Sequence, residues 1–119
     1  MKRKHHDLVA WQVAVALVKD IYRLTETFPS HELYGLTAQI RRAAVSVPSN
    51  IAEGAARATK KEFAHYLTIA RASLSEVDTQ LAIAKLLGYI DSDLEVQQTL
   101  DRVFGLIGGL LNSLRAAKQ

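Results

Sequence analysis

Glu62 and His65 form the only Glu-x-x-His pair in the chain. Such a pair is one half of the ligand set of carboxylate-bridged di-metal helix bundles, which need a second pair and a glutamate on each of the other helices. The second copy is missing, and at 100° per residue His65 points away from the apolar side of its own segment. We therefore interpret Glu62 as a helix cap and His65 as a solvated side chain, and we expect no metal site.

No other pattern indicates catalysis. The chain lacks a Gly-x-Ser-x-Gly turn, a phosphate-binding loop and a His-Glu-x-x-His zinc helix. His5 and His6 lie in a basic N-terminal tail. We expect a protein with no enzymatic activity and no cofactor, unless a site is assembled between subunits.

The first residues imitate a secretory leader, because a basic cluster precedes the apolar run 8–18. The apolar spacing nevertheless continues at a helical period beyond Lys19 and Asp20, and the run is too short to cross a bilayer. The chain also has no cysteine, which favours a reducing compartment. We therefore expect a cytoplasmic protein with no membrane partner.

Two polar stripes follow the helical period. One consists of Gln39, Arg42, Ser46, Asn50 and Glu53, and the other of Glu62, Ser73, Glu76 and Gln80. Free solvent faces more often carry Lys and Glu, so these stripes favour contact with another subunit or a specific polar network. An ordinary solvated surface is the alternative. The residues that we assign to this contact are Arg42, Ser46, Asn50, Glu53, Ser73 and Glu76.

Basic residues suggest an acidic partner. The net charge is +3 with a pI near 9.3, and Arg57, Lys60 and Lys61 cluster within five residues. Clustered positive charge suffices for weak, nonspecific phosphate binding. The candidate nucleic-acid contacts are Arg41, Arg42, Arg57, Lys60, Lys61 and Arg71, to which the N-terminal Lys2, Arg3 and Lys4 add charge. A solvated basic edge is the competing interpretation.

Four segments have the spacing of amphipathic helices and must position these residues. The first is capped by Asp7 and ends at Phe28-Pro29, and the second begins after Ser30. The third begins with the capping box Thr59 to Glu62 and ends at Gly88, and the fourth begins with the capping box Ser92 to Glu95.

The expected buried positions follow from the same spacing. In the first two helices they are Leu8, Trp11, Ala14 or Val15, Val18, Ile21 or Tyr22, and Thr25, then Leu33, Leu36, Ile40, Ala44, Val47 and Ile51. In the last two they are Phe63, Leu67, Ala70, Leu74, Val77, Leu81 and Ala84, then Leu100, Val103 or Phe104, Ile107, Leu111 and Leu114.

Short linkers predict that consecutive helices are antiparallel. The fold class is therefore all-α, an up-down-up-down four-helix bundle forming a single domain over residues 1–119, with residues 1–6 as a mobile basic tail. Pro48 predicts a kink in the second helix, which we expect to continue to Gly54; a restart capped by Asn50 is the alternative.

Three glycines, Gly105, Gly108 and Gly109, lie inside the fourth helix. Each costs a helix on the order of 1 kcal/mol relative to alanine, so a compensating contact is expected. That contact is either packing within the bundle or an oligomer seam, and the sequence does not separate the two.

The chain resembles the 23S rRNA intervening-sequence protein family, also called the four-helix-bundle or S23 family. The central signature Arg-x-x-x-Ser-x-x-x-Asn-Ile-Ala-Glu-Gly falls within "QIRRAAVSVPSNIAEGAAR" at 39–57, and Ser73 and Glu76 match the later Ser-x-x-Glu. The matching segments "LVAWQVAVALVKDIY" (8–22), "FPSHELYGL" (28–36), "EFAHYLTIARASLSEVDTQL" (62–81) and "LGYI" (87–90) extend the resemblance over most of the chain.

The resemblance implies an antiparallel bundle that assembles into a homopentamer without catalytic activity. It also suggests an RNA-related role, because some members are encoded within intervening sequences of large-subunit rRNA genes. We expect a non-enzymatic oligomer that associates with RNA or other nucleic acid through repeated basic clusters. A scaffold that binds a protein partner and no nucleic acid is the alternative.

Overall fold

The computed structural model describes residues 2–92 and 94–116. Within these residues the chain is helical and contains no strand, which confirms the all-α bundle. The elements are the 3-10 turn η1 (Lys4–Asp7), α1 (Val9–Thr25), the 3-10 turn η2 (Ser30–Glu32), α2 (Leu36–Ala55), α3 (Lys60–Leu86) and α4 (Leu94–Ala116).

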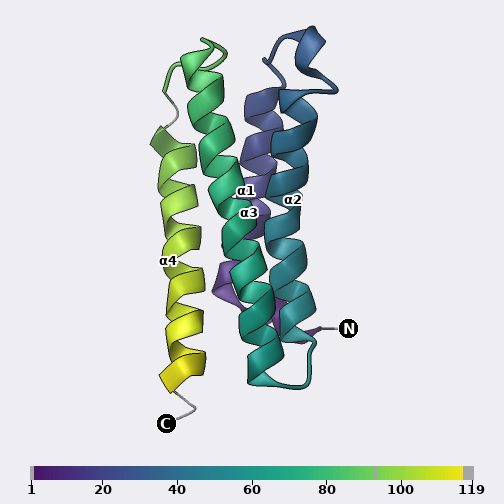
Figure 1. Ribbon diagram of the computed structural model, residues 1–119, viewed down its shortest axis with the longest axis vertical. Coiled ribbons are helices and arrows are strands. Elements are labelled where there is room, and N and C mark those ends of the chain that lie inside the picture. The colour runs from purple at the N-terminus through teal and green to yellow at the C-terminus, as the bar shows by residue number, and fades with distance from the viewer. Residues whose placement is uncertain (1, 93, 117–119) are drawn as a thin grey trace.

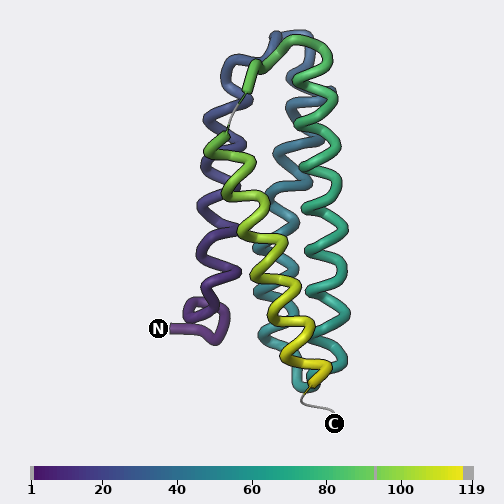
Figure 2. Tube along the Cα trace, turned by 90° about the vertical axis from the view of Figure 1, so that its left-hand side faces the viewer, coloured from purple at the N-terminus to yellow at the C-terminus, as the bar shows by residue number. Residues whose placement is uncertain are grey.

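The four helices lie side by side in a rod 48 Å long, and consecutive helices run in opposite directions (Figure 1). α2 and α3 make the most extensive contact, whereas α4 crosses the bundle obliquely (Figure 2). η1 and the last turn of α4 lie toward the same end of the rod as the α2–α3 turn (Figure 1). None of the helices that the structure describes combines the length and the apolar character that a bilayer crossing requires.

The predicted apolar positions form most of the core. Every predicted α3 position is buried except Phe63, which is half-buried, and Ile40, Ala44, Val47 and Ile51 of α2 are fully buried. Where the spacing left two adjacent residues as alternatives for one core position, the buried residue is Ala14, Ile21 or Val103. The core also contains Leu17, Ala43 and Val96, which the spacing did not single out.

Two predictions about helix starts are wrong. Asp7 does not cap α1, because it lies inside η1 and pairs with Lys2 at 2.8 Å, while Leu8 occupies the cap position without a side-chain hydrogen bond. Leu33 is not in the core but 49% exposed, because η2 delays the start of α2 to Leu36.

Glu32 anchors the delayed start of α2. Its Oε1 accepts a hydrogen bond from the Leu36 amide at 3.1 Å, and its Oε2 accepts one from the Tyr89 hydroxyl at 2.8 Å. These two bonds lower the pKa of Glu32, and the bond to the carboxylate raises the pKa of Tyr89. The pair joins the α1–α2 connection to the α3–α4 connection.

The ends of α3 confirm the predicted local chemistry. The Glu62 amide donates to Thr59 Oγ1 at 3.1 Å, although the Glu62 carboxylate accepts from the Thr59 hydroxyl rather than from its backbone. At the other end, Gly88 has φ +80°, and the Tyr89 amide donates to the Ala84 carbonyl at 2.9 Å, as in a Schellman cap. The predicted cap of the last helix includes Asp93, which lies outside the described residues.

α2 continues through Pro48 as one α-helix and ends at Ala55. The alternative restart at Asn50 is wrong, because the Asn50 side chain donates back to the Ser46 carbonyl at 2.8 Å instead of capping a new helix. The kink near Pro48 stays a prediction.

The glycines of α2 and α4 differ in their surroundings. A Cβ on Gly54 would lie 2.8 Å from Tyr66 Cβ and 2.9 Å from Phe63 Cδ1, so α2 and α3 approach too closely there for any side chain. A Cβ on Gly105, Gly108 or Gly109 would meet no atom within 4 Å. Packing within the protomer therefore does not explain the three α4 glycines.

Replacing Gly54 by alanine should destabilise the fold. Overpacking typically costs about 1–3 kcal/mol, which exceeds the gain of about 1 kcal/mol in helix propensity. We expect Gly54→Ala to lower the urea midpoint and Ala72→Ser, a control that adds one atom at an exposed position of α3, to leave it nearly unchanged. Equal stability of the two variants would contradict the close approach of α2 and α3.

Candidate functional site

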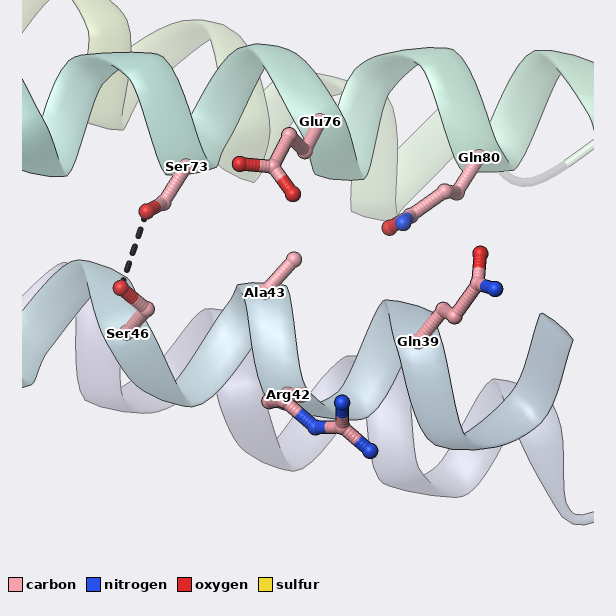
Figure 3. A pocket seen from close by; sticks show the side chains of 7 residues that line it. All are labelled: Gln39, Arg42, Ala43, Ser46, Ser73, Glu76 and Gln80. Carbon is pink, nitrogen blue, oxygen red and sulfur yellow. Dashed lines mark hydrogen bonds between the residues drawn. The ribbon is translucent and has the colours of Figure 1, made fainter. Parts of the chain in front are cut away.

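The two predicted polar stripes meet inside one chain. They line a groove of about 310 Å³ between α2 and α3, to which the residues Gln39, Arg42, Ala43, Ser46, Ser73, Glu76 and Gln80 contribute (Figure 3). The helices position these side chains because the α2 residues recur every three or four positions and face the corresponding turns of α3. Part of each stripe thus faces the other across this groove within the protomer.

Hydroxyl and amide groups close one end of the groove. Ser46 Oγ and Ser73 Oγ are 2.9 Å apart (Figure 3), and Asn50 Nδ2 donates to Ser46 Oγ at 2.9 Å and to the Ser46 carbonyl at 2.8 Å. Ser73 is only 7% exposed. Because buried hydroxyls are costly without partners, this network fixes how α2 and α3 face each other.

The rest of the groove offers unused polar groups. Arg42 and Glu76 are exposed, form no ion pair within the described residues, and do not point at each other (Figure 3). Gln80 Oε1 is buried and accepts no hydrogen bond from the described residues. Gln39 faces Gln80 across the groove (Figure 3), so a rotation of its amide would supply a donor.

Glu53, the last member of the α2 stripe, lies outside the groove. Its carboxylate accepts a hydrogen bond from Arg57, whose guanidinium also donates to the Tyr66 hydroxyl at 2.7 Å and covers the Tyr66 ring at 4.9 Å. Glu62 lies 3.9 Å from the same guanidinium. The bond to Glu53, followed by the Tyr66 contact, raises the pKa of Arg57. Arg57 therefore braces the α2–α3 turn.

The six predicted nucleic-acid contacts do not form one surface. Arg57, Lys60 and Lys61 lie at the α2–α3 turn, Arg71 is exposed along α3, and Arg42 lies on the α2–α3 groove. Arg41 faces α1, because its Nε donates to Thr25 Oγ1 at 2.8 Å and its guanidinium lies over the Tyr22 ring at 4.7 Å.

η1, which begins at Lys4, lies toward the same end of the bundle as the α2–α3 turn (Figure 1). η1 packs against α1 and α2, with His5 and His6 against the Trp11 ring at 4.9 and 5.3 Å between ring centres. Partial burial, followed by the charge of His6, lowers the pKa of His5. The mobility predicted for residues 1–6 stays a prediction, but Lys4–Asp7 form a turn with defined contacts.

Sequence reasoning missed a second groove, which lies between α1 and α2. It has a volume of about 540 Å³, and its lining residues are Tyr22, Leu33, Tyr34, Thr37, Ala38, Arg41, Arg42 and Val45. The apolar spacing had assigned Leu33 to the core. Pro29 and the polar residues after it were the available signal that α2 begins later and leaves this segment exposed.

The described residues contain no group of three or more acidic or histidine side chains placed to hold a metal ion. The Glu62 carboxylate accepts a hydrogen bond from the Thr59 hydroxyl at 3.0 Å at the start of α3, and His65 is exposed with its ring against Tyr66 at 5.4 Å. The pair therefore does not converge on a common point within the bundle.

The Asn50 network can be tested with an isosteric charge. Asn50→Asp replaces the donor by a carboxylate facing the Ser46 carbonyl, so we expect a loss of about 1–3 kcal/mol in the free energy of unfolding at neutral pH. The repulsion raises the pKa of the new carboxyl in the folded state, so the deficit should shrink as the pH falls toward about 4 and the group becomes a donor.

Ser49→Asp is the matched control, because Ser49 is exposed on the same turn and bonds only the Val45 carbonyl, at 2.8 Å. It should change stability by less than about 0.5 kcal/mol. Urea unfolding at several pH values measures both variants, and an equal, pH-independent loss in both would refute the role of Asn50.

No curated protein is significantly similar to the chain. A family model described as "23S rRNA-intervening sequence protein" matches residues 6–109, which include both grooves and the α2–α3 turn but not Lys2, Arg3 and Lys4. The match covers far more than half of the sequence and agrees with the helical bundle described above. The chain therefore belongs to the 23S rRNA-intervening sequence protein family.

Proposed function

We propose that this protein is a non-enzymatic oligomer that associates with nucleic acid, in the first place RNA, through basic residues gathered at one end of the bundle. The observation that supports this most is that the N-terminal segment, which packs against α1 and α2, and the α2–α3 turn lie toward the same end of the bundle (Figure 1). The exposed cations at this end, none of which forms an ion pair within the described part of the chain, are Arg3, Lys4, Lys60, Lys61 and Arg115.

Two of the three carboxylates that the structure describes at this end are balanced by cations, because Glu53 and Glu62 share the single charge of Arg57. Asp7 pairs with Lys2, and Glu53 and Glu62 lie against Arg57. The remaining positive charge is therefore available to phosphate groups, whose neutralisation releases counterions and drives binding that weakens as salt rises.

Lys60 and Lys61 do not stabilise the helix on which they lie. They occupy the first turn of α3, where the positive end of the helix dipole disfavours cations. Replacing these lysines should not weaken the fold, so a loss of binding can be attributed to the loss of their charge.

Assembly of several copies would bring several sets of these cations together and strengthen the positive electrostatic potential. The resemblance implies a homopentamer, and two observations support a contact with another copy. The three α4 glycines have no compensating contact inside the protomer, and Glu76 has no ion-pair partner among the described residues. A neighbouring copy could supply both.

RNA binding should depend on the lysines of the α2–α3 turn. In fluorescence anisotropy with labelled rRNA fragments, we expect Lys60→Gln/Lys61→Gln to weaken binding at low salt and to reduce the slope of log K against log salt by about 1 to 2. Lys85→Gln, on the last turn of the same helix, is the control. Absence of wild-type binding at low salt, or equal effects of the two variants, would sink the proposal.

The oligomer can be tested separately by sedimentation. We expect the wild type to sediment as a multiple of 13.1 kDa, with five copies implied by the resemblance. Glu76→Arg should shift it toward the monomer, because it reverses the charge on the groove, whereas the exposed neighbour Asp78→Arg should have little effect. A monomeric wild type would contradict this part of the proposal.

A protein-interaction scaffold is the second candidate. It is favoured by a largely apolar groove between α1 and α2, in which Val15 and Val45 are about 41% and 40% exposed; the lining residues are Trp11, Val15, Val18, Val45, Pro48, Ser49 and Ala52. An oligomeric wild type that binds no RNA at low salt would favour the scaffold.

A further inference from the structure

The α1–α2 groove exposes two aromatic rings. Tyr34 is 93% exposed, and Tyr22 is 42% exposed on the opposite wall. Leu33, next to Tyr34, is 49% exposed. Large apolar and aromatic side chains gathered around one open groove are typical of a binding surface rather than of a solvated one.

Arg41 gives the groove a fixed positive charge. Its Nε donates to Thr25 Oγ1 at 2.8 Å, its Nη2 donates to the Tyr22 carbonyl at 3.4 Å, and its plane lies over the Tyr22 ring. These contacts use two of the five N–H donors of the guanidinium and hold it in place, so the others need no ordering when a ligand arrives.

The lining of the groove contains two arginines and no carboxylate. The acidic residue nearest in sequence, Glu32, is bonded to the Leu36 amide and the Tyr89 hydroxyl. An apolar protein surface would need no such charge, whereas a ligand with both a flat ring and an anionic group matches the tyrosines and the arginines of the lining. A nucleotide has this combination, because its base stacks on aromatic and guanidinium planes and its phosphate binds arginine.

We propose that this groove binds an unpaired base of a single-stranded nucleic acid, which stacks on Tyr34 while Arg41 holds the adjoining phosphate. The inference rests on the proposed association with nucleic acid and narrows it to strands with accessible bases. Leu33 and Tyr34 of the groove belong to the α1–α2 connection, which lies at the opposite end of the rod from the α2–α3 turn (Figure 1). Variants of the two surfaces should therefore act independently.

The test measures three fluorescein-labelled probes by anisotropy on the full chain. They are a short oligouridine, an abasic strand with the same number of phosphates, and a blunt RNA duplex. For the wild type we expect oligouridine to bind more tightly than the abasic strand. Tyr34→Ala should weaken oligouridine binding between about fivefold and about 100-fold, the range found for loss of one stacked base, and leave the abasic strand and the duplex unchanged.

Two variants control for other effects of this change. Tyr34→Phe keeps the ring and should bind oligouridine as the wild type does. Leu86→Ala removes a similarly exposed apolar side chain, 87% exposed at the end of α3, and should also have no effect. Because the Tyr34 side chain is 93% exposed, circular dichroism should show an unchanged fold for both Tyr34 variants.

The outcomes separate the two proposals. If Tyr34→Ala binds oligouridine as tightly as the wild type, or if wild type does not distinguish the abasic strand, the base site is wrong while the basic end can still bind. If Lys60→Gln/Lys61→Gln has no effect but Tyr34→Ala does, the groove is the site and the basic end is not. If the wild type binds none of the probes at low salt, both proposals are overturned.

Discussion

The close approach of α2 and α3 is the constraint on which the rest of the structure depends. It is possible only because the facing residues are small: Gly54 leaves no room for a Cβ against Tyr66, and the hydroxyls of Ser46 and Ser73 are in hydrogen-bond contact at 2.9 Å. A pair of helices this close buries its backbone groups and small side chains at native density, so even one added methyl group must displace a neighbour. α1 and α4 then pack around this pair.

The same approach determines which charges at the α2–α3 turn stay free. Because the end of α2 lies against the start of α3, Arg57 reaches Tyr66 and Glu62 as well as Glu53 on its own helix. Its charge is thereby used within the protein, whereas Lys60 and Lys61 point into solvent. The N-terminal segment lies at this end as well because α1 runs away from it and α2 runs back to it (Figure 1). The basic end is thus a product of topology and not of one sequence motif.

Local patterns predicted what depends on local chemistry. Apolar residues recur along α3 at alternating intervals of four and three residues, and this spacing predicts its buried face. Thr59 and Gly88 predict its ends. Both predictions depend only on residues that are close in sequence. Adjacent candidates such as Ala14 and Val15 lie 100° apart on a helix, so the choice between them depends on where the next helix packs. Spacing could not supply that position.

The same limit applied to the candidate sites. The polar stripes were visible in the sequence, but whether they faced each other or another copy depended on the packing of α2 against α3. The spacing of four residues between Glu53 and Arg57 permits an ion pair on one helix, but nothing in the sequence indicates the contact between Arg57 and Tyr66. The sequence did not predict the α1–α2 groove. The spacing of Leu33 suggests a buried helical position, but η2 precedes it and α2 begins only at Leu36, so Leu33 is exposed.

The two grooves share one wall, and this links their behaviour. Arg41 and Arg42 are adjacent in sequence, yet Arg41 is bonded toward α1 while Arg42 lies beside the α3 groove, although its side chain also borders the other. Between the grooves, Ala44 and Val47 are fully buried. Since a close-packed interior transmits a shift rather than absorbing it, α2 cannot move to widen one groove without repacking against the other neighbour. Any displacement of α2 on its α1 side would therefore also act on the Ser46–Ser73 contact on its α3 side.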